Sequence, residues 1–140
     1  MSVLASARLV GVKRLLAAEG ASGSNSKDCA AAAGRVYEKL SSRIGPLLGA
    51  AGVRALFARS ATLAGRELAD VTGIGSLESS TTLTAFLEEL APAIAHQVAE
   101  TLFETFLSLI TTFIGERLTL QALRGAWPTL EDSAPRENQT

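Results

Sequence analysis

The sequence predicts an all-α protein, a compact bundle of about five or six helices around a central hydrophobic helix at about residues 92–115. Alanine and leucine, which favour helices, are its two most frequent residue types, while strand-favouring aromatic residues make up only 5% of the chain. Apolar residues also recur at intervals of three and four, which gives a helix one apolar face. The most apolar segment does not alternate apolar and polar residues as a half-buried strand does.

A chain of 140 residues with 47% hydrophobic and 19% charged residues is expected to fold as one domain. We expect an N-terminal helix or extension at 1–19, a flexible linker at 20–28, the helical bundle at 29–128 and a disordered polar tail at 129–140. A targeting segment over residues 1–25 stays open, because the first acid comes only at position 19. The basic residues scatter around that helix, which favours a plain N-terminal helix.

Start and stop residues divide the bundle into helices. The second helix is expected to begin near Asp28 and to end at Gly45 and Pro46, and a corner at 47–52 separates it from the third. The expected inward residues are Ala33, Val36, Tyr37, Leu40 and Ile44 in the second helix and Val53, Leu56, Phe57, Leu63, Ala64 and Leu68 in the third.

Residues 69–80 have the composition of a loop. Ser79 or Ser80 can cap the fourth helix, whose inward residues are Leu83, Phe86, Leu87 and Leu90. Pro92 either opens a fifth helix or kinks one long helix.

The central helix is predicted by the angular positions of its side chains. At about 100° per residue, the polar residues fall in one sector of roughly 140° and apolar residues fill the remainder. The polar set is Gln97, Glu100, Thr101, Glu104, Thr105, Ser108, Thr111 and Thr112. The longest uncharged run, Thr105 to Gly115, has 11 residues, whereas a transmembrane helix needs about 20 apolar residues. We therefore expect a buried bundle helix and no transmembrane span.

The helical pattern changes phase near Gly115, where Arg117 and Arg124 would fall on the former apolar face. A short last helix with a new apolar face, ended by Pro128, is expected beyond this glycine.

Charge and cysteine content limit the partners and the compartment. Thirteen basic and fourteen acidic residues nearly cancel, so nucleic acid is not the expected partner. Cys29 is the single cysteine, which excludes an intrachain disulfide and favours a reducing, cytoplasmic location. Its position near a helix start favours thiolate, but the neighbouring Asp28 opposes it, so we interpret Cys29 as a packing residue.

His96, the single histidine, is the candidate for ligand binding together with Glu100 and Phe103, which follow on the same helix. Such a set could orient a small apolar ligand held between helices, and His96 could serve as an axial haem ligand. The sequence lacks the ligand spacing of a metal site and the polar constellations of catalysis. We therefore expect neither an enzyme nor a bound metal or cofactor.

A weak helix-turn-helix pattern gives an alternative function. Residues 47–60 follow a helix and a corner and include Arg54 and Arg59, which could contact DNA. Against this alternative, the spacing of Val53, Leu56 and Phe57 is that of a core face.

The favoured hypothesis is a non-enzymatic interaction or regulatory module that forms a homo-oligomer, most simply a dimer. Its apolar content is high for a small bundle to bury, which favours self-association. The expected contact residues lie in the first and last helices: Leu9, Val12, Leu16, Leu120, Leu123 and Trp127. A carrier or sensor of a small apolar ligand is the alternative, and a pocket of several hundred Å³ would favour it.

Overall fold

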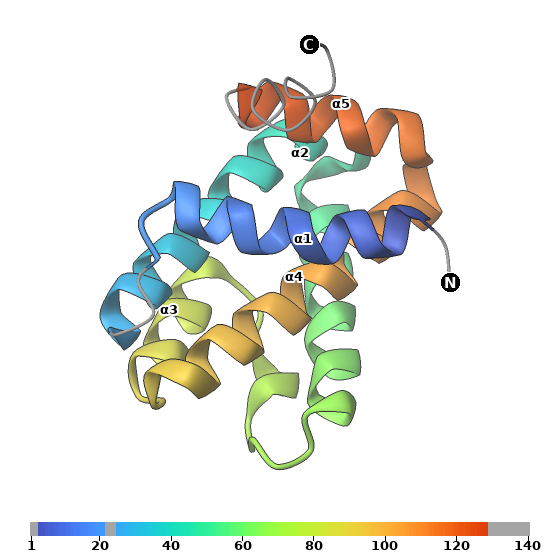
Figure 1. Ribbon diagram of the computed structural model, residues 1–140. Helices are drawn as coiled ribbons and strands as arrows, with labels where there is room; N and C mark the ends of the chain where they lie inside the picture. The colour runs from blue at the N-terminus through green and yellow to red at the C-terminus, as the bar shows by residue number, and fades with distance from the viewer. Residues whose placement is uncertain (1–2, 22–24, 129–140) are drawn as a thin grey trace, which may run out of the picture.

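The computed structural model describes residues 3–21 and 25–128, with side chains from residue 11 onward. In these residues it contains five α-helices, one short 3-10 helix and no strand, which confirms the all-α prediction (Figure 1). The elements are α1 (Val3–Ala18), α2 (Ser26–Glu67), η1 (Ile74–Ser76), α3 (Ser80–Glu88), α4 (Pro92–Ile114) and α5 (Glu116–Ala126).

Helix α2 is bent into two arms, and it contacts each of the other four α-helices. Its first arm runs toward α5, and its second arm returns along the other side of the molecule (Figure 1). Helix α4 crosses the molecule diagonally against both α1 and α2, and it also contacts α3 and α5. The central position predicted for residues 92–115 is thus confirmed.

The bend of α2 lies at Gly49, within the corner predicted at 47–52, but the first arm stays helical past Gly45 and Pro46, where the sequence placed its end. Gly49 has φ 82° and ψ 156°, a backbone conformation that is essentially confined to glycine. Proline disfavours helical geometry in the preceding residue through a clash that involves the Cβ atom of that residue. Gly45 has no Cβ, so the chain stays helical through Pro46 until the glycine at position 49 lets it turn.

The helix starts agree with the sequence in part. Ser79 caps α3, and its side chain accepts a hydrogen bond from the backbone N–H of Thr82 in a capping box. Pro92 occupies the first turn of α4, so it opens a helix and does not kink one. The cap of α2 is Asn25 and not Asp28, because the Asn25 side chain accepts from the amides of Lys27 and Asp28.

The core is built around aromatic rings from both arms of α2 and from α4. The Phe57 ring lies 4.6 Å from Tyr37 and 5.3 Å from Phe106 between ring centroids, in edge-to-face geometry. Phe103 is buried beside them. Every inward residue expected in the second helix is buried, and none of the eight polar residues expected to face outward on α4 is. Val12, Leu15 and Leu16 of α1 also belong to this core.

One described helix, α2, is long and apolar enough to cross a membrane by length and composition. A third of its most apolar stretch is buried inside the protein. A core helix meets the same two criteria, so they do not place α2 in a membrane.

Candidate functional site

The three residues expected to bind a ligand lie in different environments on α4. His96 and Glu100 are partly exposed, whereas Phe103 is fully buried between Phe57 and Phe106. The Glu100 carboxylate lies 4.0 Å from the Lys13 ammonium of α1. Glu100 therefore faces α1, and the Phe103 ring is part of the packed core.

Neither Cys29 nor a cluster of acids and histidines provides a reactive or metal-binding site among the residues that the structure describes. No group of three or more His, Cys, Asp or Glu side chains in this part of the chain could hold a metal ion. Burial, together with the negative charge of Glu100, raises the pKa of the Cys29 thiol to about 11. The thiolate that would act as a nucleophile is therefore scarce at neutral pH.

Three of the six residues expected to form an intermolecular contact lie inside the protein. Val12, Leu16 and Trp127 are buried within the chain, so they offer no surface to a second molecule in this conformation. Leu120 and Leu123 are partly buried, and Leu9 lies outside the residues whose side chains are described. The apolar faces of the first and last helices are covered mainly by the bundle itself, because α1 packs against α4 and α5 packs against α2 and α4.

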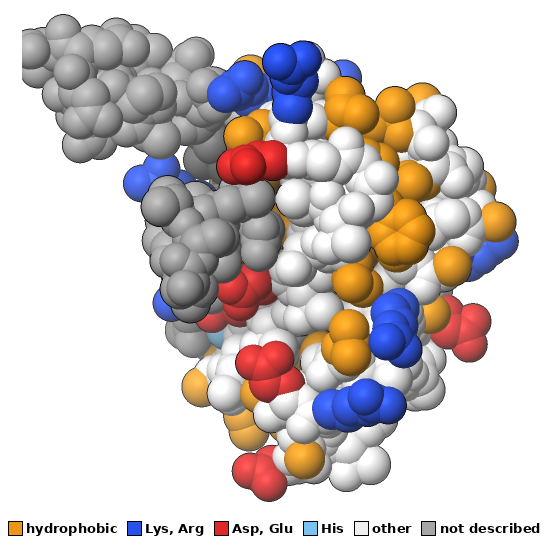
Figure 2. Space-filling view, turned by 90° about the vertical axis from the view of Figure 1, so that its right-hand side faces the viewer, with side chains coloured by type: hydrophobic (Ala, Val, Ile, Leu, Met, Phe, Trp, Pro, Cys, Tyr) orange, Lys and Arg blue, Asp and Glu red, His pale blue; other side chains and the backbone are white. Residues whose placement is uncertain are grey.

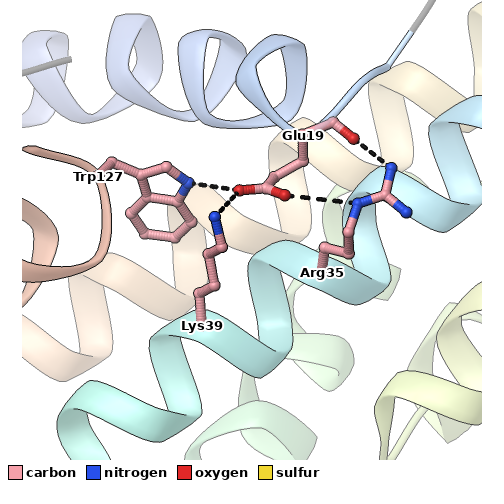
Figure 3. A network of polar contacts seen from close by, with 4 residues as sticks. All are labelled: Glu19, Arg35, Lys39 and Trp127. Atoms are coloured by element: carbon pink, nitrogen blue, oxygen red, sulfur yellow. Dashed lines mark hydrogen bonds and ion pairs between the residues drawn. The ribbon is translucent and has the colours of Figure 1, made fainter. Parts of the chain in front are cut away.

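Trp127 takes part in a polar network that closes the bundle between α1, α2 and the end of α5 (Figure 3). Its Nε1 donates to a Glu19 carboxylate oxygen at 2.9 Å, and the Lys39 ammonium lies 2.5 Å from the same oxygen. The Arg35 guanidinium pairs with the other oxygen at 3.4 Å and also donates to the Glu19 carbonyl. The Lys39 ammonium lies 5.7 Å from the centroid of the Trp127 ring.

The Glu19 carboxylate is charged in this network. Its burial would by itself raise its pKa, but hydrogen bonds from Lys39 and Trp127 and the charges of Lys39 and Arg35 outweigh that effect. The pKa of Glu19 therefore lies below its ordinary value. The network joins elements that are distant in sequence, and its polar groups bind one another. We therefore interpret it as a structural contact and not as a ligand site.

The segment expected to resemble a helix-turn-helix lies within α2. Its corner is the bend at Gly49 inside that helix, and Val53 and Phe57 point into the core. Arg54 and Arg59 are exposed on the second arm. DNA recognition by this segment stays a prediction.

Exposed apolar side chains occur where α4 passes into α5. Phe113 is 65% exposed and Leu118 is 36% exposed, and both lie within three residues of Gly115, whose φ of 92° allows the corner between the helices. Figure 2 looks onto this side of the molecule, and hydrophobic side chains gather in the upper right part of that face. We call Phe113, Glu116, Arg117 and Leu118 the junction surface.

The apolar face of α4 explains why Phe113 is exposed. Phe106 and Ile110 on this face are buried, but Phe113, one turn further on, lies beyond the helices that cover them. The sequence assigned Phe113 to the apolar face, and only the arrangement of the neighbouring helices shows that this turn is uncovered.

No protein-family model, curated protein or solved structure matches this chain. Functional inference therefore depends on its own residues and their geometry.

Proposed function

We propose that this protein is a non-enzymatic helical interaction module that pairs with a second copy of itself through the junction surface. The observation that supports this proposal is the 65% exposure of Phe113 at the end of an apolar face on which Phe106 and Ile110 are buried. Burying a phenylalanine side chain fully contributes roughly 1.5–3 kcal/mol relative to leaving it exposed. Covering this ring is thus a favourable source of association energy.

The charges of the chain favour a second copy as the partner. The net charge is −1, so two copies repel each other only weakly. Glu116 and Arg117 are exposed beside the apolar residues, and neither makes an ion pair with another residue in the described ranges. In a twofold-symmetric dimer each surface faces its own copy, so an acid and a base that lie side by side can pair reciprocally across the interface.

Light scattering of the purified protein over a range of concentrations tests the proposal. The wild-type chain is expected to form dimers at high micromolar concentration, and Phe113→Gln is expected to weaken association about tenfold or more. Glutamine favours helices, so this exposed substitution should leave α4 intact.

Ile94→Gln provides the matched control, because Ile94 is 39% exposed on the same helix but at its opposite end. This variant is expected to dimerise as the wild type does. A wild-type chain that stays monomeric throughout, or equal weakening by both substitutions, would refute pairing through the junction surface.

A further inference from the structure

A surface pocket of about 440 Å³ lies at the bend of α2, away from the junction surface. Its walls come from both arms of α2 and from the first turn of α3, and its polar lining residues are Tyr37, Glu38, Ser41, Arg54, Ser79 and Ser80. Small-molecule sites usually enclose about 300–1,000 Å³. The pocket is therefore large enough for a small metabolite, and the bend at Gly49 brings its two walls together.

The pocket contains one negative and one positive side chain. The Glu38 carboxylate accepts a hydrogen bond from the Ser80 hydroxyl at 2.6 Å, which joins the first arm of α2 to α3. Arg54, on the second arm, is exposed, and its guanidinium makes no ion pair or hydrogen bond with another side chain in the described part of the chain. A ligand of a single charge would be attracted by one of these groups and repelled by the other. A ligand with both charges can pair with both.

Ser41 and Tyr37 form part of the pocket wall on the first arm of α2. The Oγ of Ser41 is buried and makes no hydrogen bond with another residue in the described ranges. Beside it, the Tyr37 ring is held by its packing against Phe57 and Phe106. This part of the wall is consequently rigid before a ligand arrives.

We infer that this pocket binds a free α-amino acid. The Arg54 guanidinium pairs with the ligand carboxylate, and the Glu38 carboxylate accepts hydrogen bonds from the ligand ammonium. The ligand side chain lies against the apolar part of the wall, to which Val53 and Ala50 contribute. None of the junction-surface residues lines the pocket, so this inference is independent of the proposed self-association.

The experiment begins with saturation-transfer NMR of the full chain with each of the common L-amino acids in turn. The tightest binder is then titrated by calorimetry and compared with its methyl ester and its N-acetyl derivative, each of which removes one ligand charge. At least one amino acid is expected to bind with a Kd of about 1 mM or lower. Each derivative is expected to bind about tenfold more weakly or worse, because one charge-assisted hydrogen bond is lost.

Substitutions test the protein side of the same contacts. Arg54→Gln and Glu38→Gln are each expected to weaken binding about tenfold or more. Both residues are exposed, so the fold should tolerate the changes, and circular dichroism checks this. Arg59→Gln is the matched control, because Arg59 is exposed on the same arm of α2 but does not line the pocket, and it should change binding less than about twofold.

Two results would overturn the inference. One is the absence of binding by every amino acid up to about 10 mM. The other is binding that depends on Arg54 or Glu38 no more than it depends on Arg59, which would place the ligand elsewhere on the protein.

Discussion

Glu19 makes more polar contacts with distant elements than any other residue in Figure 3, since it meets side chains from both α2 and the end of α5. Its pKa in the folded protein is lower than its ordinary value of 4.5. A group with a depressed folded-state pKa contributes stability above the unfolded-state value, and that contribution is lost as the pH falls through the folded-state pKa. The Glu19 contribution is therefore complete at neutral pH and declines below about pH 4.5.

Replacement of Glu19 by glutamine should reveal this dependence. Glu19→Gln is expected to lower the free energy of unfolding by about 1–2 kcal/mol at pH 7, because hydrogen bonds to a charged group are replaced by hydrogen bonds to a neutral one. The difference from wild type should shrink as the pH falls below about 4.5. Urea unfolding at a series of pH values measures it. Asp70→Asn, at an exposed acid, is the control, and a Glu19→Gln difference that does not vary with pH would contradict the prediction.

The sequence did not predict the Glu19 network, although it contains all four residues. Glu19 and Trp127 are 108 positions apart, and no local spacing indicates that they meet. Trp127 was assigned to an intermolecular surface because an apolar face shows that a side chain is covered, but not by which chain. Its burial against α1 and α2 depends on the path of the chain between them.

At the scale of elements, periodicity predicted the helix faces well and local stop signals predicted helix ends unevenly. Helix α4 matches the prediction from its proline start to its glycine end, because a long apolar face determines it and both end signals act in their usual way. The bend of α2 at Gly49 lies within the predicted corner at 47–52, but the first arm of the helix continues past the predicted stop at Gly45 and Pro46. The glycine before Pro46 removes the clash on which the stop signal depends, and the break moves to Gly49.

Substitution of Gly49 tests whether the bend requires glycine. Gly49→Ala is expected to destabilise the protein by about 1–3 kcal/mol, because its φ of 82° and ψ of 156° are strained for any residue with a Cβ. Apart from the adjacent backbone, no atom of the described residues lies within 4 Å of the added methyl, so the loss would come from backbone strain and not from a clash. Chemical denaturation measures the change.

Gly11→Ala is the control for this substitution. Apart from the adjacent backbone, no atom of the described residues lies within 4 Å of a Cβ added at Gly11 either, but Gly11 lies inside α1 and has no positive φ. Alanine should raise stability there by roughly 0.5–1 kcal/mol, because glycine is unfavourable inside a helix. If Gly49→Ala and Gly11→Ala changed the free energy of unfolding equally, the backbone at position 49 would not be strained by an alanine.

At the scale of the whole molecule, the fold leaves two surfaces with different chemistry. The pocket at the bend of α2 combines Glu38 with Arg54, and the junction surface combines Phe113 with Leu118. The sequence favoured a self-associating module over a small-ligand carrier. It placed the contact on six residues, of which the bundle buries Val12, Leu16 and Trp127, and it placed the ligand near His96. Both surfaces depend on where neighbouring helices end or bend, and periodicity along a single helix does not contain that information.

Self-association also makes a prediction about thermal unfolding. If the folded chain pairs and the unfolded chain does not, the Tm must rise with protein concentration. A tenfold increase stabilises a dimer by about 1.4 kcal/mol, which corresponds to about 2 °C in Tm for protomers of this size. Differential scanning calorimetry over two decades of concentration should show this rise for the wild type and for Ile94→Gln. Phe113→Gln should show a nearly constant Tm. If the Tm rose equally with protein concentration in all three proteins, the chain would associate through a surface other than the junction surface.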